Sequence, residues 1–167
     1  MDANASDAIK TVRASQSEMT EVVLPNDANP LGNILGGKVM HLMDICGAIA
    51  AHRHSGSYVV TASFDSVEFL NPVRVGDLIV LKSSVNRVFR TSLEVGVKVF
   101  SENILTGARR HTSSAYITFV ALDEYGRRKE IPAVQPETEE ETRRFREAGA
   151  RREHRLFQRN RKHGATA

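Results

Sequence analysis

The chain has one cysteine, few aromatic residues and no long apolar run. Each of these shortages excludes a type of fold stabilisation, a cellular location or a class of partner. The single cysteine among its 167 residues, Cys46, leaves the fold without an internal disulfide and indicates a reducing compartment. No basic segment followed by an apolar stretch opens the chain, and its apolar runs are too short to cross a bilayer. The sequence therefore predicts a cytoplasmic protein with no membrane partner.

An excess of one charge is also absent over most of the chain. Residues 1–136 carry 14 Lys and Arg against 14 Asp and Glu, whereas residues 137–163 carry nine against six. The formal net charge of +3 therefore comes entirely from the C-terminal segment. With a neutral body and only 6% aromatic residues, nucleic acid is not favoured as a partner. The 41% hydrophobic residues suffice for the core of a single domain.

Composition divides the chain into three segments. Residues 1–17 are polar and predict a flexible N-terminal segment, and residues 18–136 form the predicted domain. Residues 137–167 predict a charged C-terminal helix and tail, because acidic residues open the segment and arginines follow, as the helix dipole favours. Three residues spaced by four and seven, with a neighbouring phenylalanine, predict how this helix packs on the body: Phe145, Gly149, Leu156 and Phe157. Its charged faces are either simply solvated or partly in contact with ligand phosphates.

One acid lies within an otherwise apolar helix. From Val39 to Ala51, ten of thirteen residues are apolar, and the exceptions are His41, Asp44 and Gly47. Apolar residues on nearly all sides predict a helix that is buried on most sides. A carboxylate there is costly unless it is paired, neutralised or used in chemistry, so Asp44 marks a candidate site.

A glycine-rich stretch, GNILGG, comes directly before this helix. It places Asn33 near the predicted helix start and Gly36 and Gly37 in its first turn, where backbone N–H groups have no partner within the helix. A polar side chain, free N–H groups and an embedded acid together predict a functional site.

The residues after the helix predict strands. Apolar residues alternate or run continuously in four segments, and a short first strand precedes the helix: Tyr58–Leu70, Leu78–Phe89, Leu93–Val99, Arg110–Leu122 and Glu21–Pro25. In the first of these the apolar phase changes near Asp65–Ser66, which predicts a bulge or bend. The element order predicts an α+β hotdog fold, an antiparallel sheet wrapped around one long buried helix, with a C-terminal helix added.

Four stretches resemble the hotdog-fold acyl-CoA thioesterases, the bacterial and cytosolic acyl-CoA hydrolase group. They are NDANPLGNILGGKVMHLMD, VVTASFDSVEFLNPVRVGD, RTSLEVGVKV and FVALDEYGRRKEIP, which start at residues 26, 59, 90 and 119. The resemblance extends over roughly residues 18–160, nearly the whole domain. It implies hydrolysis of acyl-CoA to a carboxylic acid and coenzyme A, with no cofactor and no metal.

The resemblance also implies which residues act. In this family the asparagine before the Gly-Gly pair and the aspartate within the helix are the catalytic pair, which correspond here to Asn33 and Asp44. Asp44 is expected to act as general base or as a nucleophile that forms an anhydride. Asn33 and the N–H of Gly37 are expected to orient water or to stabilise the oxyanion. The family binds pantetheine along strand edges, which implies as substrate-binding residues Val67, Glu68, Phe69, Arg90, Thr91 and Ser92. Arg87 and Arg90 are candidates for contacts with the nucleotide phosphates, and Gly36 permits close approach of a ligand.

Distance along the helix predicts an oligomer. Asp44 lies seven residues past Gly37, about 10 Å along the axis, so a loop residue before the helix cannot easily reach it within one chain. A second subunit with its helix antiparallel would close that gap. The family pairs Asn and Asp across such a dimer, usually within a trimer of dimers, which implies the same homo-oligomer here.

Other interpretations remain open from the residues alone. Asp44 could be a structural acid bonded to His41, one turn away. The domain could bind acyl-CoA as a regulatory module without turnover. A hotdog hydratase would need a catalytic histidine motif that the chain lacks, and the absence of a Gly-x-Ser-x-Gly sequence argues against a serine hydrolase. His52 and His54 do not share a helix face, so a metal site is not predicted.

Overall fold

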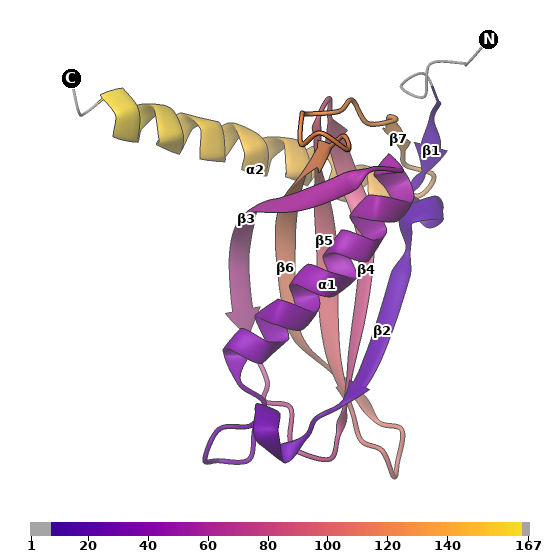
Figure 1. Ribbon diagram of the computed structural model, residues 1–167. Helices are drawn as coiled ribbons and strands as arrows, with labels where there is room; N and C mark the ends of the chain where they lie inside the picture. Colours follow the sequence, from indigo (N-terminus) through magenta and orange to yellow (C-terminus); the bar gives the residue numbers. More distant parts are fainter. Residues whose placement is uncertain (1–7, 165–167) are drawn as a thin grey trace.

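The computed structural model describes residues 8–164, which form one curved antiparallel sheet with a helix on each side (Figure 1). The sheet has the strand order β2-β4-β5-β6-β3. Its strands are β2 (Ser17–Val22), β3 (Tyr58–Phe69), β4 (Leu78–Phe89), β5 (Ser92–Glu102) and β6 (Arg109–Leu122). The helices are α1 (Gly36–Ser55) and α2 (Glu139–Gly164). None of the helices described in this range is both long and apolar enough to cross a membrane.

Helix α1 lies in the hollow of the sheet and carries most of the core. It begins at the predicted Gly-Gly pair and ends before Gly56, whose φ of 60° lets its N–H bond the carbonyl of His52. The side that faces the sheet is fully buried, but Met40 and Ile45 on the other side are 36% and 37% exposed. Within a single chain the predicted burial therefore holds for the side of the helix that packs on the sheet, but not for the opposite side. An apolar face remains open.

Strand β3 forms one edge of the sheet and follows directly after α1. Ser66 has a φ of 46°, and the pairing with β6 shifts between Asp65 and Glu68, which confirms the predicted bulge. Several of its apolar side chains, including Val60 and Phe69, are exposed. Edge strands with exposed apolar residues can pair with another chain.

The segment before the sheet is ordered over much of its length. β1 (Lys10–Thr11) pairs in parallel with β7 (Val134–Gln135), and η2 (Val12–Ser15) follows it. Ser15 is buried, and its Oγ accepts the N–H of Val85 at 2.9 Å. The predicted flexible segment, residues 1–17, is therefore wrong for residues 10–15, because the burial of Val12 and this hydrogen bond hold them in place. Residues 1–7 lie outside the described part of the chain. The first long strand is β2 instead of residues 21–25, and the short η3 (Pro25–Asp27) follows it.

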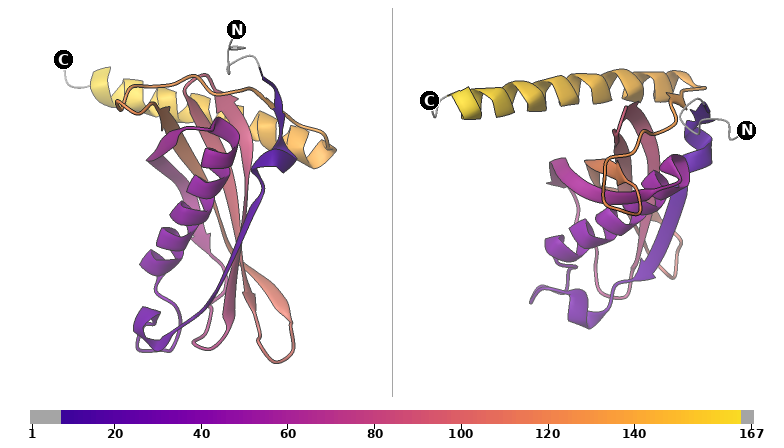
Figure 2. Two further views of the ribbon diagram at one scale, coloured as in Figure 1. Left: turned by 45° about the vertical axis from the view of Figure 1, so that its right-hand side comes forward. Right: turned by 45° about the horizontal axis from the view of Figure 1, so that its top comes forward.

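Helix α2 crosses the face of the sheet opposite α1, and its C-terminal end extends past β3 (Figures 1 and 2). Arg151 bonds the fully buried Glu94 at 2.7 Å and stacks over the ring of Tyr116 at 3.5 Å. Helix α2 passes close to the Arg87 guanidinium at Gly149, so a Cβ at this position would force the arginine side chain to shift.

The apolar residues of α2 only partly follow the predicted stripe. Phe145 packs against the core, but Leu156 and Phe157 are exposed, Phe157 by 62%. The prediction that these two residues pack on the body is wrong within one chain, because the helix has already passed β3 where they lie. Ionic and cation–aromatic contacts hold most of α2 to the sheet.

Candidate active site

Asp44 lies on α1 where the helix faces the start of β3, and it is only partly buried. Its Oδ1 accepts a hydrogen bond of 2.6 Å from Oγ1 of Thr61. His41, one turn earlier, is exposed and is not the partner of this carboxylate. Among the residues described, the other carboxylate oxygen has no protein donor. A carboxylate with one oxygen held and one accessible can accept a proton from water.

A cavity of about 370 Å³ opens at the N-terminal end of α1. Asn33, Gly36 and Phe69 line it, together with Asn29 from the preceding loop. The Phe69 ring lies close to Gly36, and a Cβ at this position would be in ordinary van der Waals contact with the ring at 3.4 Å. Gly37 follows in the first helical turn, whose N–H groups have no partner within the helix.

Two asparagines in the loop before α1 present their amide groups differently. Oδ1 of Asn29 accepts the backbone N–H groups of Leu31 and Asn33 at 3.0 and 3.1 Å, which fixes its orientation. Within the described part of the chain, Nδ2 of Asn29 has no acceptor, and the carboxamide of Asn33 has no partner at all. Both asparagines can therefore donate to a ligand, but only Asn29 is held in place by its own oxygen.

Asp44 and the cavity are separate within one chain. Asp44 comes eight positions after Gly36, which corresponds to about 12 Å along the helix axis. Thr61 fixes Asp44 beside the beginning of β3, whereas Phe69 at its end lies against Gly36. The residues of the predicted site thus form two half-sites.

The predicted substrate-binding residues divide between the two ends of the sheet. Val67 packs against the core, and Glu68 and Phe69 are exposed near the cavity. The turn between β4 and β5, which holds Thr91, lies at the opposite end, because Ser92 is level with Val60 through β6. The structure therefore does not bring these two groups together in one chain.

The two arginines predicted to bind substrate differ in how free their guanidinium groups are to contact a ligand. Arg87 lies between α2 and the sheet, where its Nη1 donates to the carbonyl of Phe145 and its guanidinium stacks on that ring at 4.4 Å. Within one chain the structure does not support Arg87 as a substrate-binding residue, because its guanidinium already contacts α2. Arg90 sits in the turn with a φ of 53° and is largely exposed, paired with Glu130 at 3.1 Å.

Other chemistry-bearing groups are structural. Burial raises the pKa of the Cys46 thiol, which lies 3.3 Å from the hydroxyl of Ser83 inside the core. Across residues 8–164, His, Cys, Asp and Glu side chains nowhere gather in a group of three that could hold a metal ion.

Sequence comparison finds one family model and several relatives. The thioesterase superfamily model matches residues 31–108. The uncharacterized acyl-CoA thioester hydrolase YkhA of Bacillus subtilis is 43% identical over 129 residues, which cover 77% of this chain and 75% of that protein. The cytosolic acyl coenzyme A thioester hydrolase of Homo sapiens is 34% identical over 143 residues. That match covers 84% of this chain but only 38% of the longer human protein.

Solved structures with the same arrangement include an acyl-CoA hydrolase from Staphylococcus aureus in complex with butyryl coenzyme A, coenzyme A and coenzyme A disulfide. Its TM-score is 0.87 at 33% identity, with 95% of this chain and 96% of that chain covered. A hexameric acyl-CoA thioesterase without ligand gives 0.86 at 45% identity, with 90% and 96% covered. Further structures of the Staphylococcus aureus enzyme carry alanine in place of an asparagine, an aspartate and a threonine at its positions 28, 43 and 60.

Proposed function

This chain belongs to the hotdog-fold acyl-CoA thioesterases, a family of thioester hydrolases, and from that premise we propose that Asp44 is its catalytic carboxylate. The observation that carries the proposal is the position of Asp44, partly accessible on the open face of α1 with one oxygen held by Thr61. In the proposed reaction the free oxygen takes a proton from water, and the water oxygen attacks the thioester carbonyl carbon. Collapse of the tetrahedral intermediate breaks the C–S bond, and the departing thiolate takes the proton held by Asp44 to become the thiol of coenzyme A, which returns Asp44 to its carboxylate form. Direct attack by Asp44 to form an anhydride is the second route.

Thr61 is proposed to position Asp44. In the Staphylococcus aureus enzyme the substituted threonine lies 17 residues after the aspartate, positions 60 and 43. Thr61 lies the same 17 residues after Asp44. The shared spacing supports the assignment of this pair, and the hydrogen bond supplies a physical reason for it.

The oxyanion needs donors, and the loop before α1 supplies them. Asn33 and the N–H of Gly37 are the donors that the family resemblance implies. Asn29 is a second carboxamide at the same cavity, and it lies 15 residues before Asp44, the spacing of positions 28 and 43 in the Staphylococcus aureus enzyme. Its fixed orientation makes Nδ2 a preorganised donor, which supports Asn29 as the stronger candidate of the two asparagines.

The complete site is proposed to form between two subunits. The open face of α1 and the exposed edge of β3 would be covered by a second copy, and a two-fold axis would place one Asp44 near the partner's loop. Gly36, Val67, Glu68 and Phe69 would then line the acyl-pantetheine path. Hexameric relatives support assembly of copies, and we propose a trimer of such dimers.

The proposed reaction uses no cofactor, and the cytosolic relative supports a cytoplasmic location. Release of coenzyme A from acyl-CoA, followed with a thiol reagent over a series of chain lengths, tests the activity. Turnover that depends on enzyme concentration is expected for at least one chain length. Tight binding of acyl-CoA without release of thiol would instead indicate the non-catalytic binding module.

A further inference from the structure

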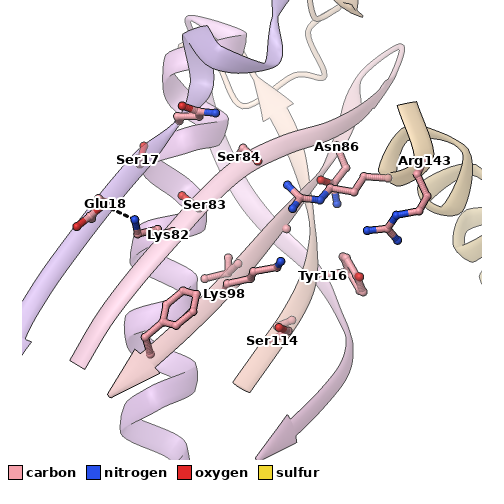
Figure 3. Close-up of a pocket in the computed structure, with 16 residues that line it drawn as sticks. Ser17, Glu18, Lys82, Ser83, Ser84, Asn86, Lys98, Ser114, Tyr116 and Arg143 are labelled. Carbon is pink, nitrogen blue, oxygen red and sulfur yellow. Dashed lines mark ion pairs between the residues drawn. The ribbon is translucent and has the colours of Figure 1, made fainter. Parts of the chain in front are cut away.

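The face of the sheet opposite α1 holds a second cavity, of about 540 Å³, which α2 borders on one side (Figure 3). Side chains alternate along a strand, so the two faces can be assigned from one contact. Oγ of Ser83 donates to the carbonyl oxygen of Cys46 on α1 at 2.7 Å, and its neighbour Lys82 therefore points to the other face. This cavity lies across the sheet from Asp44, outside the two half-sites described above.

Cationic side chains from two strands and a helix line this cavity: Lys82, Lys98, Arg143 and Arg144. Three of the four already have carboxylate partners. Glu18 lies 3.2 Å from Lys82, and Glu140 and Glu147 pair with the two arginines. Lys98 is the exception, because it has no carboxylate partner among the residues that the structure describes. One ammonium group is thus left free at the rim of a cationic cavity.

Lys98 and Lys82 lie directly opposite each other on β5 and β4. Like charges at directly opposed positions on one face of a sheet destabilise it. Glu18 compensates only the outer lysine of this pair. An anion bound over the two ammonium groups would remove the repulsion and so stabilise this arrangement.

The floor of the cavity is open because a glycine occupies the middle of β5. Gly96 pairs with Ser84 on one side and with Tyr116 on the other. A Cβ there would lie 3.0 Å from the Asn86 amide, so the glycine also makes room for that side chain. Hydroxyl groups remain around the opening, with Ser114 beside Lys98 (Figure 3). Glycine within a strand is typical of places where a ligand approaches the backbone closely.

We propose that this cavity binds the phosphate groups of a small molecule, with Lys98 as the principal cation. Its volume falls within the range of small-molecule sites, and ammonium, guanidinium and hydroxyl donors are the groups that bind phosphate oxygens. Two sources share this chemistry. One is a free diphosphate compound, and the other is the diphosphate of coenzyme A itself.

Calorimetric titration with inorganic pyrophosphate and, separately, with coenzyme A tests the site and needs no turnover, so its result is independent of the proposed hydrolysis. The variant is Lys98→Gln, which removes the charge and keeps an unbranched polar side chain that is only one atom shorter. Arg128→Gln is the matched control, because Arg128 is exposed, lies outside the cavity and also loses one charge. Lys98→Gln is expected to weaken binding of one or both probes roughly tenfold, and Arg128→Gln to change it less than about twofold.

The pattern of losses identifies the source. Weaker binding of pyrophosphate alone assigns a free diphosphate ligand, and weaker binding of coenzyme A assigns the substrate's own nucleotide part. The melting temperature of the unliganded Lys98→Gln variant should stay the same or rise, because the lysine repulsion is relieved. The proposal is overturned if neither titration depends on Lys98, if Arg128→Gln weakens binding equally, or if the variant melts several degrees lower.

Discussion

Thr61 on β3 donates a hydrogen bond of 2.6 Å to Asp44 on α1 and so ties the edge strand to the one carboxylate of the helix's open face. Both side chains remain accessible to solvent, since Thr61 is exposed and Asp44 is half-buried. A hydrogen bond between a hydroxyl and a solvent-accessible carboxylate adds little to the stability of the fold, because water can replace the hydroxyl as the donor. Its value lies in orientation, since it holds one oxygen and leaves the other for chemistry.

Replacing Thr61 by valine should therefore affect turnover more than stability. The substitution keeps the branched shape and removes the hydrogen-bond donor, so kcat should fall about tenfold while the melting temperature barely moves. Steady-state release of coenzyme A measures the first quantity and thermal unfolding the second. Thr61→Ser retains the hydroxyl and should recover most of the lost rate. Equal rates for the valine and serine variants would show that the Thr61 hydroxyl does not position Asp44 for catalysis.

Activity should reappear when two inactive variants share a dimer. Asp44→Asn and Asn33→Ala subunits, mixed in equal amounts and allowed to exchange, place both native residues in one site of each mixed dimer. Because half of the dimers are mixed, recovery should approach about a quarter of wild-type activity. Repeating the mixture with Asn29→Ala distinguishes the two asparagines. Mixtures that demonstrably exchange subunits but stay inactive would argue that each site lies within one chain.

The buried ion pair between Glu94 and Arg151 should dominate the docking of α2. Arg151→Met leaves the fully buried Glu94 without its cation, and a loss of about 3 kcal/mol in unfolding free energy is expected. Arg143→Met is the matched control on the same helix, because Arg143 pairs with Glu140 and Glu147 at the surface. Solvent screens those pairs, so denaturant midpoints should hardly change. A similar midpoint for both variants would contradict this assignment.

Stability should decline on mild acidification through His54. Burial lowers the pKa of this imidazole below its ordinary value of 6.5, and Lys10 adds to the effect, while the bond to the Pro132 carbonyl opposes it. The unfolded chain then takes up a proton that the folded chain resists, so stability is full above the ordinary pKa and is lost as the pH falls below it. The melting temperature should drop between about pH 7.5 and pH 5.5.

Variants separate this effect from other titrations. His54→Gln should melt at a lower temperature overall but with a flatter pH dependence in the same range. His52→Gln, at an exposed position two residues earlier, should keep the slope of the wild type. A slope that survives in His54→Gln would show that another group controls it.

Much of the fold follows from pattern alone. Apolar periodicity predicts α1 and the four long strands, and the change of phase at Asp65 and Ser66 predicts the bulge. Burial is harder to predict, because an all-round apolar helix can be covered by its own sheet or by another chain. Met40 and Ile45 are open for that reason. The docking of α2 cannot be predicted from apolar periodicity either, because Arg151 bonds a buried glutamate that lies 57 residues earlier in the sequence.

Only part of the candidate site can be predicted from the sequence. An acid in an apolar helix stands out in the sequence, and Asp44 does so without any structure. Thr61 does not, because a threonine in a strand is ordinary, and only the fold brings it to the carboxylate. Asn29 lies in an Asn-Pro turn and looks like a loop residue until the structure shows its oxygen bonded and its amide group free. Side-chain partners distant in sequence cannot be inferred from composition or period.

The most direct test of the central claim is the rate of coenzyme A release by Asp44→Asn, measured beside wild type and Glu124→Gln. The amide has the shape of the carboxylate and can still bond Thr61, so the fold should persist, but it cannot take a proton from water. Glu124 is an exposed acid on the loop after β6, and its variant controls for loss of a negative charge. We expect at least about a hundredfold loss of kcat for Asp44→Asn and none for Glu124→Gln. Wild-type turnover by a folded Asp44→Asn variant would contradict it.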